Sequence, residues 1–314
     1  MDKQQLIDCQ NRIKPFIHNT PILTSRLLDD MVGGSVFFKC ENFQRMGAFK
    51  MRGAANAIMQ LSEAQKQNGV VTHSSGNFAQ ALSLAAQSLG VKAYIVMPSS
   101  APQVKKNAVK GYGGKVIECE PTLEARERES KHIVDSYGAT FIHPSNDDAV
   151  ILGQGTACME LLESYPDLDF VVTPVGGGGL IAGTALAAHY FGNSCATIGG
   201  EPSEVDDAYR SLISGKIETN KTTQTIADGL KTQLGDRNFP IIQQHVQKII
   251  RVTEAEIVAA MRLLWERLKI VCEPSSAVAF AAVLKEKNQF VGKKTGIIIS
   301  GGNVDLDHLP FGRS

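Results

Sequence analysis

Short apolar runs alternate along the chain with longer stretches in which hydrophobic residues recur at helical spacing. The runs are rich in β-branched residues and show no in-out alternation, which is typical of strands covered on both faces. This order predicts an α/β fold with mostly parallel sheets flanked by helices. The predicted strands are 35–40, 70–73, 93–97, 115–118, 170–173 and 296–300, with another near 141.

Helices are expected between these strands. The segment from 76 to 90 is a clear case, since Phe78, Ala81, Leu82 and Ala85 fall on one stripe of a helix and Gly90 can end it. Further helices are predicted at 50–61, 148–164 and 180–191.

The predicted elements divide the chain into two parts. Residues 68–146 form a compact βαβαβαβ series, which we interpret as an inserted small domain. Residues 1–67 and 147–314 would then make up the large domain. The segment 213–238 is the most loop-like stretch of the chain and is a candidate cover for an active site.

Composition narrows the class of partner. The 314 residues are 43% hydrophobic, and 32 basic residues balance 32 acidic ones, so no net charge favours nucleic acid or an anionic membrane. No apolar run reaches the roughly 18 residues of a membrane span, and the first residues do not resemble a secretory signal. The six cysteines lack CxxC spacing, which favours reduced thiols. We therefore expect a cytoplasmic protein with a small-molecule partner.

Four consecutive glycines, Gly176 to Gly179, stand between a buried strand and an apolar helix. Glycine permits positive φ and close backbone approach, so successive N–H groups and the helix N-terminus can converge on a phosphate. The pattern is neither GxGxxG nor GxxxxGK[ST], which favours a phosphate monoester over a dinucleotide or nucleoside triphosphate. The alternative is a plain strand-to-helix turn.

Two more glycine loops follow predicted strands. Ser74, Ser75, Gly76 and Asn77 place two hydroxyls and an amide beside helix N–H groups and can hold a carboxylate, although these residue types are also common helix caps. The third loop, 300–303, closes the last apolar strand in the same way.

Lys50 opens a predicted helix next to an aromatic residue, Phe49. A lysine in such a place is usually a solvated surface charge. A lysine near a glycine loop that can bind phosphate (176–179) and a loop that can bind a carboxylate (74–77) is, however, what a Schiff-base enzyme requires. Its amine can form the imine and later move a proton.

These motifs carry a family resemblance. The segments 41–53, 73–77, 176–179, 226–229, 273–274 and 300–305 resemble the serine racemase and serine/threonine dehydratase family of fold type II, which uses pyridoxal 5′-phosphate (PLP). The match runs in order from about Ile13 to Asp305. Within the family, the chain is most similar to eukaryotic-type serine racemase, through the segments 73–77, 201–207 and 265–269. The resemblance implies two open, twisted, mostly parallel sheets, a large and a small domain, and a homodimer.

The resemblance also implies roles for single residues. Lys50 would bind PLP as the Schiff base, with Phe49 beside the ring and Gly176, Gly177, Gly178 and Gly179 around the phosphate. Asn77 would meet the phenolic oxygen and Ser300 the pyridine nitrogen. Ser74, Ser75, Gly76 and Asn77 would bind the substrate carboxylate.

Ser75 is the most informative position in the resemblance. In racemases of the family a serine there stands across the PLP plane from the lysine, so that one group removes the α-proton and the other returns a proton on the opposite face. Dehydratases without racemase activity often have alanine. The alternative is that Ser75 only caps a helix and touches the carboxylate.

Glu201, the Val205 carbonyl and Asp207 match a divalent-cation site of the serine racemase branch. Oxygen ligands of this kind suit Mg²⁺, with Ca²⁺ or Mn²⁺ as alternatives. On their own, two carboxylates six residues apart could equally be capping acids.

Two departures from the family pattern affect the substrate and regulation. Phe78 replaces the histidine that is usual in the family. Residues 143–147 differ from the motif that helps bind ATP in animal serine racemases, which argues against activation by ATP, although Lys105 and Lys269 match the family pattern. Arg126 could meet an acidic side chain.

We thus expect a PLP-dependent serine racemase that also dehydrates serine to pyruvate and ammonia. A threo-3-hydroxyaspartate ammonia-lyase, an aspartate racemase or a short threonine dehydratase are alternatives on the same fold. A non-catalytic binding protein is the alternative outside enzymes.

Overall fold

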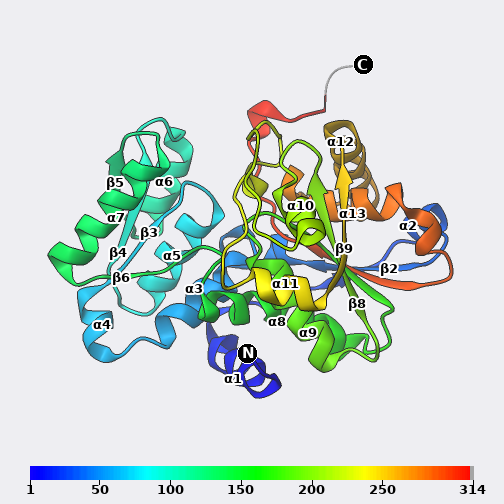
Figure 1. The fold of residues 1–314 in the computed structure, drawn as a ribbon, viewed down its shortest axis with the longest axis horizontal. Helices are drawn as coiled ribbons and strands as arrows, with labels where there is room; N and C mark the ends of the chain where they lie inside the picture. The colour runs from blue at the N-terminus through cyan, green and yellow to red at the C-terminus, as the bar shows by residue number, and fades with distance from the viewer. Residues whose placement is uncertain (312–314) are drawn as a thin grey trace.

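The computed structural model describes residues 1–311 and contains two separate sheets (Figure 1). The larger sheet has the order β1-β2-β10-β7-β8-β9, in which every pairing is parallel except that of β1 with β2. The smaller sheet has the order β5-β4-β3-β6 and is entirely parallel. The predicted α/β class with two open, mostly parallel sheets is therefore confirmed.

The strands have the following bounds: β1 Ile22–Leu23, β2 Ser35–Cys40, β3 Val70–His73, β4 Ala93–Pro98, β5 Lys115–Cys119, β6 Thr140–Phe141, β7 Phe170–Pro174, β8 Ala196–Pro202, β9 Val246–Val252 and β10 Lys294–Ile299. The helices are α1 Lys3–Ile13, α2 Arg26–Val32, α3 Lys50–Met59, α4 Glu63–Asn68, α5 Asn77–Ser88, α6 Gln103–Gly111, α7 Leu123–Tyr137, α8 Asp148–Ser164, α9 Gly179–Phe191, α10 Asp207–Ser214, α11 Phe239–His245, α12 Glu254–Leu263 and α13 Pro274–Lys285.

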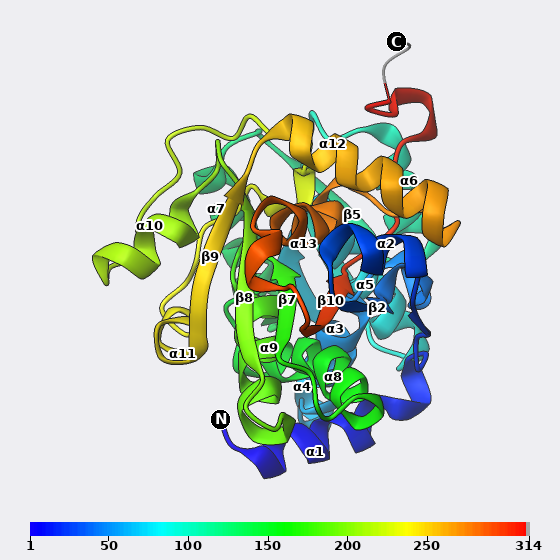
Figure 2. The same cartoon turned by 90° about the vertical axis from the view of Figure 1, so that its right-hand side faces the viewer.

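Helices cover both faces of the larger sheet. In Figure 2, α2, α12 and α13 lie on one side of β2, β10, β7 and β8, whereas α1, α8 and α9 lie on the other. This arrangement explains why the central strands carry continuous apolar runs such as Ile297, Ile298 and Ile299, all fully buried.

The smaller sheet is also covered on two sides. Val70 and Ile95 belong to the large core cluster on the α5 face, while their neighbours Val71 and Val96 pack toward α7 in a cluster of their own. Successive strand residues point to opposite faces, so both faces are buried. All four strands lie within 68–146, the range for which an inserted domain is predicted.

The sequence pattern missed β8 and β9. Gly199 and Gly200 interrupt β8, and glycine is depleted in strands. The structure requires them, since a Cβ on Gly199 would lie 2.6 Å from the Val175 side chain and one on Gly200 would lie 2.8 Å from the Val278 carbonyl oxygen. β9 is an edge strand with exposed polar residues.

A buried ionic cluster anchors α3. Arg52 on α3 binds Glu41 at 2.7 Å and Glu160 at 2.8 Å, and Lys39 binds Glu160 at 2.6 Å. Arg52, Glu41 and Lys39 have no exposed surface. Because each buried charge depends on its partner, the cluster ties α3 rigidly to β2 and α8.

Within the described residues, no helix has the length and apolarity to cross a membrane.

Candidate active site

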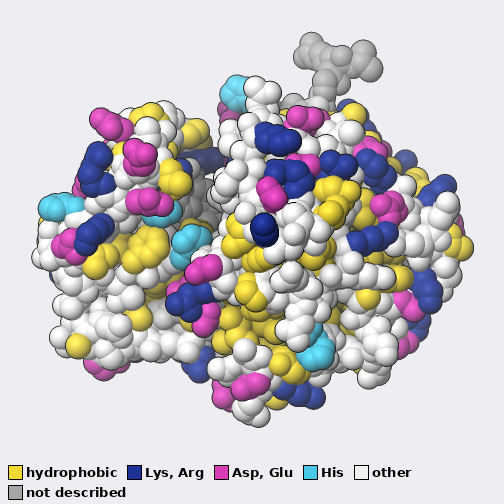
Figure 3. Space-filling view, viewed as in Figure 1, with side chains coloured by type: hydrophobic (Ala, Val, Ile, Leu, Met, Phe, Trp, Pro, Cys, Tyr) yellow, Lys and Arg dark blue, Asp and Glu magenta, His cyan; other side chains and the backbone are white. Residues whose placement is uncertain are grey.

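A cavity of ≈ 1080 Å³ lies between the two sheets and is lined by the loops that follow β3 and β7 and by the end of β10. Figure 3 shows the surface hollowed between the part that contains β3 to β6 and the rest of the molecule. Ligands of open α/β sheets bind outside the carboxyl ends of parallel strands, so this is the expected place for a site. Three glycine loops predicted from the sequence do meet here.

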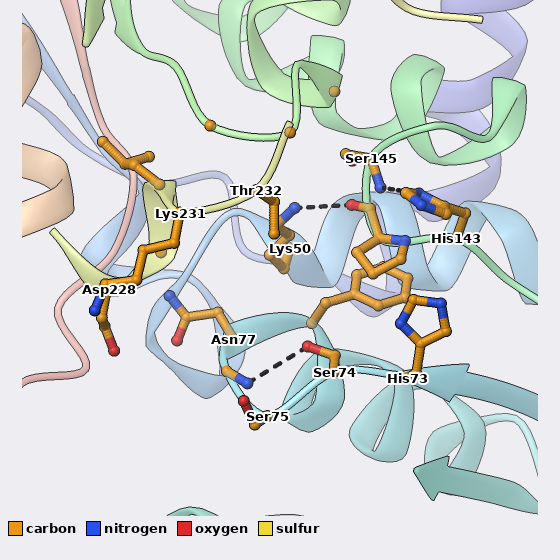
Figure 4. A pocket seen from close by; sticks show the side chains of 18 of the residues that line it. Lys50, His73, Ser74, Ser75, Asn77, His143, Ser145, Asp228, Lys231 and Thr232 are labelled. Carbon is orange, nitrogen blue, oxygen red and sulfur yellow. Dashed lines mark hydrogen bonds between the residues drawn. The ribbon is translucent and has the colours of Figure 1, made fainter. Parts of the chain in front are cut away.

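Lys50 begins α3 and reaches into this cavity (Figure 4). Its Nζ donates a hydrogen bond to the Pro144 carbonyl oxygen at 2.8 Å and lies 4.9 Å from the centre of the Phe49 ring. Burial lowers the pKa of Lys50 to about 7, although the negative charge of Glu273 acts in the opposite direction. A substantial fraction of this amine is therefore neutral near pH 7 and able to act as a nucleophile or base.

The four-glycine loop connects β7 to α9 and leaves no room for side chains. A Cβ on Gly177 would lie 2.4 Å from the Ser145 Oγ and 2.9 Å from the Thr232 Oγ1, and Gly178 has a φ of 83° that favours glycine. Two hydroxyls and the N-terminus of α9 thus converge on one point of the cavity wall. Hydroxyls and helix N–H groups together bind phosphate.

The serine-rich loop after β3 also faces the cavity. Ser74, Ser75, Gly76 and Asn77 all line it. α5 begins at Asn77 with Gly76 as its N-cap, and no side chain of the described residues caps it. The structure therefore offers no cap bond from Ser75, and the first N–H groups of α5 remain available for an anion.

Asn77 is held by a carboxylate that sequence reasoning did not assign a role. Its Nδ2 donates to Glu273 Oε1 at 3.0 Å and to Oε2 at 3.1 Å, and its Oδ1 accepts from Asn303 Nδ2 at 2.9 Å. The contact predicted for Asn77 at the phenolic oxygen stays a prediction. Glu273 is only 3% exposed, and burial together with the charge of Asp228 raises its pKa to about 7.

The segment 273–274 carries part of the family resemblance, but Glu273 was given no role because an acidic residue before Pro274 at the start of α13 is ordinary. Ser300 is nearby on the cavity wall, with its Oγ 3.0 Å from the Ser276 Oγ. Phe49 lines the same wall.

His143 and Arg126 form another part of the wall, together with His73. The Nδ1 of His143 accepts hydrogen bonds from the backbone N–H of Ser145 at 3.2 Å and of Asn146 at 2.8 Å. Burial, with the nearby His73 and Lys50, lowers the pKa of His143 to about 4, so the ring is neutral and carries its proton on Nε2.

The predicted cation ligands lie apart from the cavity. Glu201 accepts the backbone N–H of Ala208 and Tyr209, while Asp207 Oδ1 is buried with no partner among residues 1–311. Burial and the charge of Asp207 raise the pKa of Glu201, and burial raises that of Asp207 to about 6. Two proximal carboxylates and an unpartnered oxygen fit a cation, although the described residues contain no group of three or more His, Cys, Asp or Glu that could hold a metal.

The cavity brings together a buried lysine and a glycine loop suited to a phosphate, and comparison with known proteins gives the class. Residues 13–301 match the family described as pyridoxal-phosphate dependent enzyme, and the chain belongs to this family. The resemblance stated from the sequence is confirmed, as are the fold class and the dependence on PLP.

Two similar relatives span almost the whole chain. A beta-hydroxyaspartate dehydratase of Paracoccus denitrificans is 48% identical over 98% of each chain, and a serine racemase of Dictyostelium discoideum is 49% identical over 96% of this chain and 94% of the relative. The crystal structure of serine racemase from Dictyostelium discoideum superposes with a TM-score of 0.94 at 48% identity, covering 98% of this chain and 99% of the other.

Proposed function

We propose that the protein is a PLP-dependent serine racemase that also eliminates water from serine. The observation that carries this proposal is that a buried lysine amine with a pKa of about 7 and the Ser75 hydroxyl line one cavity together with a glycine cup. Racemisation by two bases places one proton-transfer group on each face of the α-carbon, whereas elimination begins with removal of the α-proton by one group.

The residues of this cavity fit PLP. Gly176 to Gly179, with the hydroxyls of Ser145 and Thr232, would hold the phosphate. This role is supported by the two hydroxyls, which lie 2.4 Å and 2.9 Å from the point where a Cβ on Gly177 would be, and by the N-terminus of α9. Phe49 would pack beside the ring, and Asn77 and Ser300 would bind its polar atoms. When bound, PLP withdraws electrons from the α-carbon and makes the α-proton acidic.

The chain's own residues would then handle the substrate. Ser74, Ser75, Gly76 and Asn77 would bind its α-carboxylate at the N-terminus of α5. Lys50 would move the proton on one face of the α-carbon and Ser75 on the other. Ser300 would meet the pyridine nitrogen with a hydroxyl, which, unlike a carboxylate, would not keep that nitrogen protonated.

The first experiment asks whether Lys50 holds the cofactor. The purified protein should show the visible absorbance band of lysine-bound PLP, and borohydride should remove it. Lys50→Ala should lack the band, whereas Lys105→Ala should keep it. Absence of this band from the wild-type protein after addition of PLP would refute the role of Lys50 as the residue that binds the cofactor.

The second experiment asks whether Ser75 is the second acid-base group. Ser75→Ala should lower racemisation of serine at least tenfold more than elimination, because elimination from the enantiomer handled by Lys50 needs only that base. Ser130→Ala, which removes a hydroxyl from the α7 wall of the same cavity, should change neither rate. Equal losses of both activities in Ser75→Ala would contradict the assignment.

A second candidate substrate class is supported by Arg126. Arg126 lines the cavity and makes no ion pair among the described residues. It lies near His73, whose pKa is lowered first by burial and then by the charge of Arg126, so that this ring is neutral. These donors suit the side-chain carboxylate of 3-hydroxyaspartate or aspartate. Arg126→Gln should raise KM for 3-hydroxyaspartate about tenfold or more while leaving KM for serine within about threefold; no turnover of either acidic substrate by the wild type would remove this candidate.

We also propose that Glu201, the Val205 carbonyl and Asp207 bind Mg²⁺, with Ca²⁺ or Mn²⁺ as alternatives. The unpartnered Asp207 oxygen supports this, and added Mg²⁺ should raise the melting temperature of the wild type and not of Asp207→Asn. The proposed homodimer can be tested by light scattering. The proposed cytoplasmic location and the domain boundaries at 68 and 146 rest on the sequence.

A further inference from the structure

Gln154 is a fully buried polar residue at the junction of three parts of the site. It lies on α8, which packs against both α3, the helix of Lys50, and α9, the helix of the glycine loop. Its Cγ is 3.2 Å from the point where a Cβ on Gly53 of α3 would lie, and its Oε1 is 2.5 Å from the corresponding point on Gly179 of α9. The side chain is therefore confined on both sides, and its amide has little freedom to rotate.

The amide of Gln154 shares a hydrogen-bond acceptor with Lys50. The Pro144 carbonyl oxygen accepts from Lys50 Nζ at 2.8 Å and from Gln154 Nε2 at 3.2 Å. A carbonyl oxygen has two lone pairs and can accept both bonds at once. Pro144 belongs to the loop after β6, so Gln154 is the contact that ties this carbonyl to the helical core.

The free amine of Lys50 needs a fixed position during turnover. When the substrate displaces the Lys50 amine from the cofactor, the amine must remain close to both the α-proton and the cofactor to which it will bind again. The hydrogen bond to Pro144 occupies one N–H of the amine and so limits the directions in which its lone pair can point. A misplacement of a reacting group by about 1 Å can cost a hundredfold in rate.

We infer that Gln154 is a positioning residue, which holds the Pro144 carbonyl where it receives the Lys50 amine each time that amine leaves the cofactor. This inference rests on the proposed function, because it requires a lysine that alternates between the cofactor and a resting place. Gln154 acts only through Pro144 and touches no reacting atom. The simpler alternative is that Gln154 fills space between α3 and α9 and shapes the phosphate cup.

The two alternatives differ in a spectroscopic rate. The holoenzyme is equilibrated with glycine, which displaces the lysine but has no β-substituent to eliminate, and is then diluted rapidly. The return of the visible band of lysine-bound PLP measures how well the free amine is placed. Gln154→Met, which keeps the length of the side chain and removes the amide, should slow this return about five- to tenfold, as expected for the loss of one hydrogen bond.

Retention of PLP in the same protein measures the phosphate cup independently. Gln154→Met should change the Kd of PLP less than about twofold, because the glycines, Ser145 and Thr232 are unchanged and methionine keeps the length of the side chain beside Gly179. Met159→Leu, another change to a buried residue of α8, should alter neither quantity. Gln154→Asn is the substitute if Gln154→Met does not fold. Its side chain is one methylene shorter, so its amide cannot reach Pro144, and it should likewise slow the return of the band of lysine-bound PLP.

Two results would overturn the inference. One is an unchanged rate of return in a folded Gln154 variant. The other is a loss of PLP affinity by the same factor as the loss of rate, which would mean that Gln154 only shapes the cup. If the wild type itself shows no lysine-bound PLP, the proposed function fails and this inference fails with it.

Discussion

Replacing Glu273 with glutamine should make the stability of the protein less sensitive to pH. Glu273 is buried against Asn77 and Asn303, and its pKa is raised from 4.5 to about 7, first by burial and then by the charge of Asp228. At ~1.36 kcal/mol for each pKa unit, this difference amounts to about 3 kcal/mol. Glutamine has nearly the same shape and cannot ionise.

The sign follows from proton binding. The folded state holds the proton of Glu273 more tightly than the unfolded state does, so the protonated carboxyl stabilises the fold fully below pH 4.5. That contribution is lost as the pH rises to about 7. The free energy of unfolding of Glu273→Gln, minus that of the wild type, should therefore rise by about 3 kcal/mol across this window.

A loss of stability that does not vary with pH will accompany this rise in the free-energy difference. In either orientation of its amide, the glutamine Nε2 would face a donor: Asn77 Nδ2, which now donates to Oε1 at 3.0 Å, or the backbone N–H of Asn303, which now donates to Oε2 at 3.1 Å. An unmatched donor costs roughly 1 to 3 kcal/mol at every pH. The informative quantity is thus how the difference in free energy of unfolding between Glu273→Gln and the wild type changes with pH, and not its value at one pH.

The assay is urea unfolding of both proteins, followed by circular dichroism, at a series of pH values on either side of the window. Glu124→Gln, at an exposed glutamate in the first turn of α7, serves as the matched control and should show no comparable slope. A difference between Glu273→Gln and the wild type that is flat with pH would refute the reasoning, because the carboxyl would then ionise equally in both states.

Further outcomes follow from the glycine loop, the buried charges and the lysine. Gly177→Ala should weaken PLP binding more than tenfold, since the new Cβ would lie 2.4 Å from the Ser145 Oγ; titration with PLP measures this, and an unchanged Kd would contradict the crowded cup. Arg52→Met should lower the free energy of unfolding by about 3 to 5 kcal/mol because it leaves Glu41 buried without its guanidinium; a loss below ~1 kcal/mol in urea unfolding would argue against a tight cluster. The rate at which PLP joins Lys50 should fall as the pH drops below about 7, because protonation removes the lone pair, and stopped-flow absorbance would detect a pH-independent rate as a contrary result.

Local sequence was enough to predict most of the fold. The strands at 70–73, 93–97 and 296–300 are buried on both faces, and such strands carry continuous apolar runs that can be recognised without knowing their neighbours. β8 was missed because its Gly199 and Gly200 are required by contacts with Val175 and Val278, which lie far away in the sequence.

Local sequence also identified the parts of the site that consist of short motifs. Lys50, the serine-rich loop and the four glycines are recognisable because each sits at the end of a strand or the start of a helix, where backbone N–H groups are exposed. Such positions depend on a few neighbouring residues.

The charge states and hydrogen-bond partners of the site depended on the tertiary structure. Glu273 meets Asn77 and Asn303 from separate elements, and Gln154 meets Pro144 and Gly179 only because α8 packs between α3 and α9. Burial shifts the pKa of both Lys50 and Glu273 to about 7, and no sequence motif reveals burial of this kind. The sequence alone determined which groups the site contains, whereas packing decided which of them are deprived of water and therefore how they ionise.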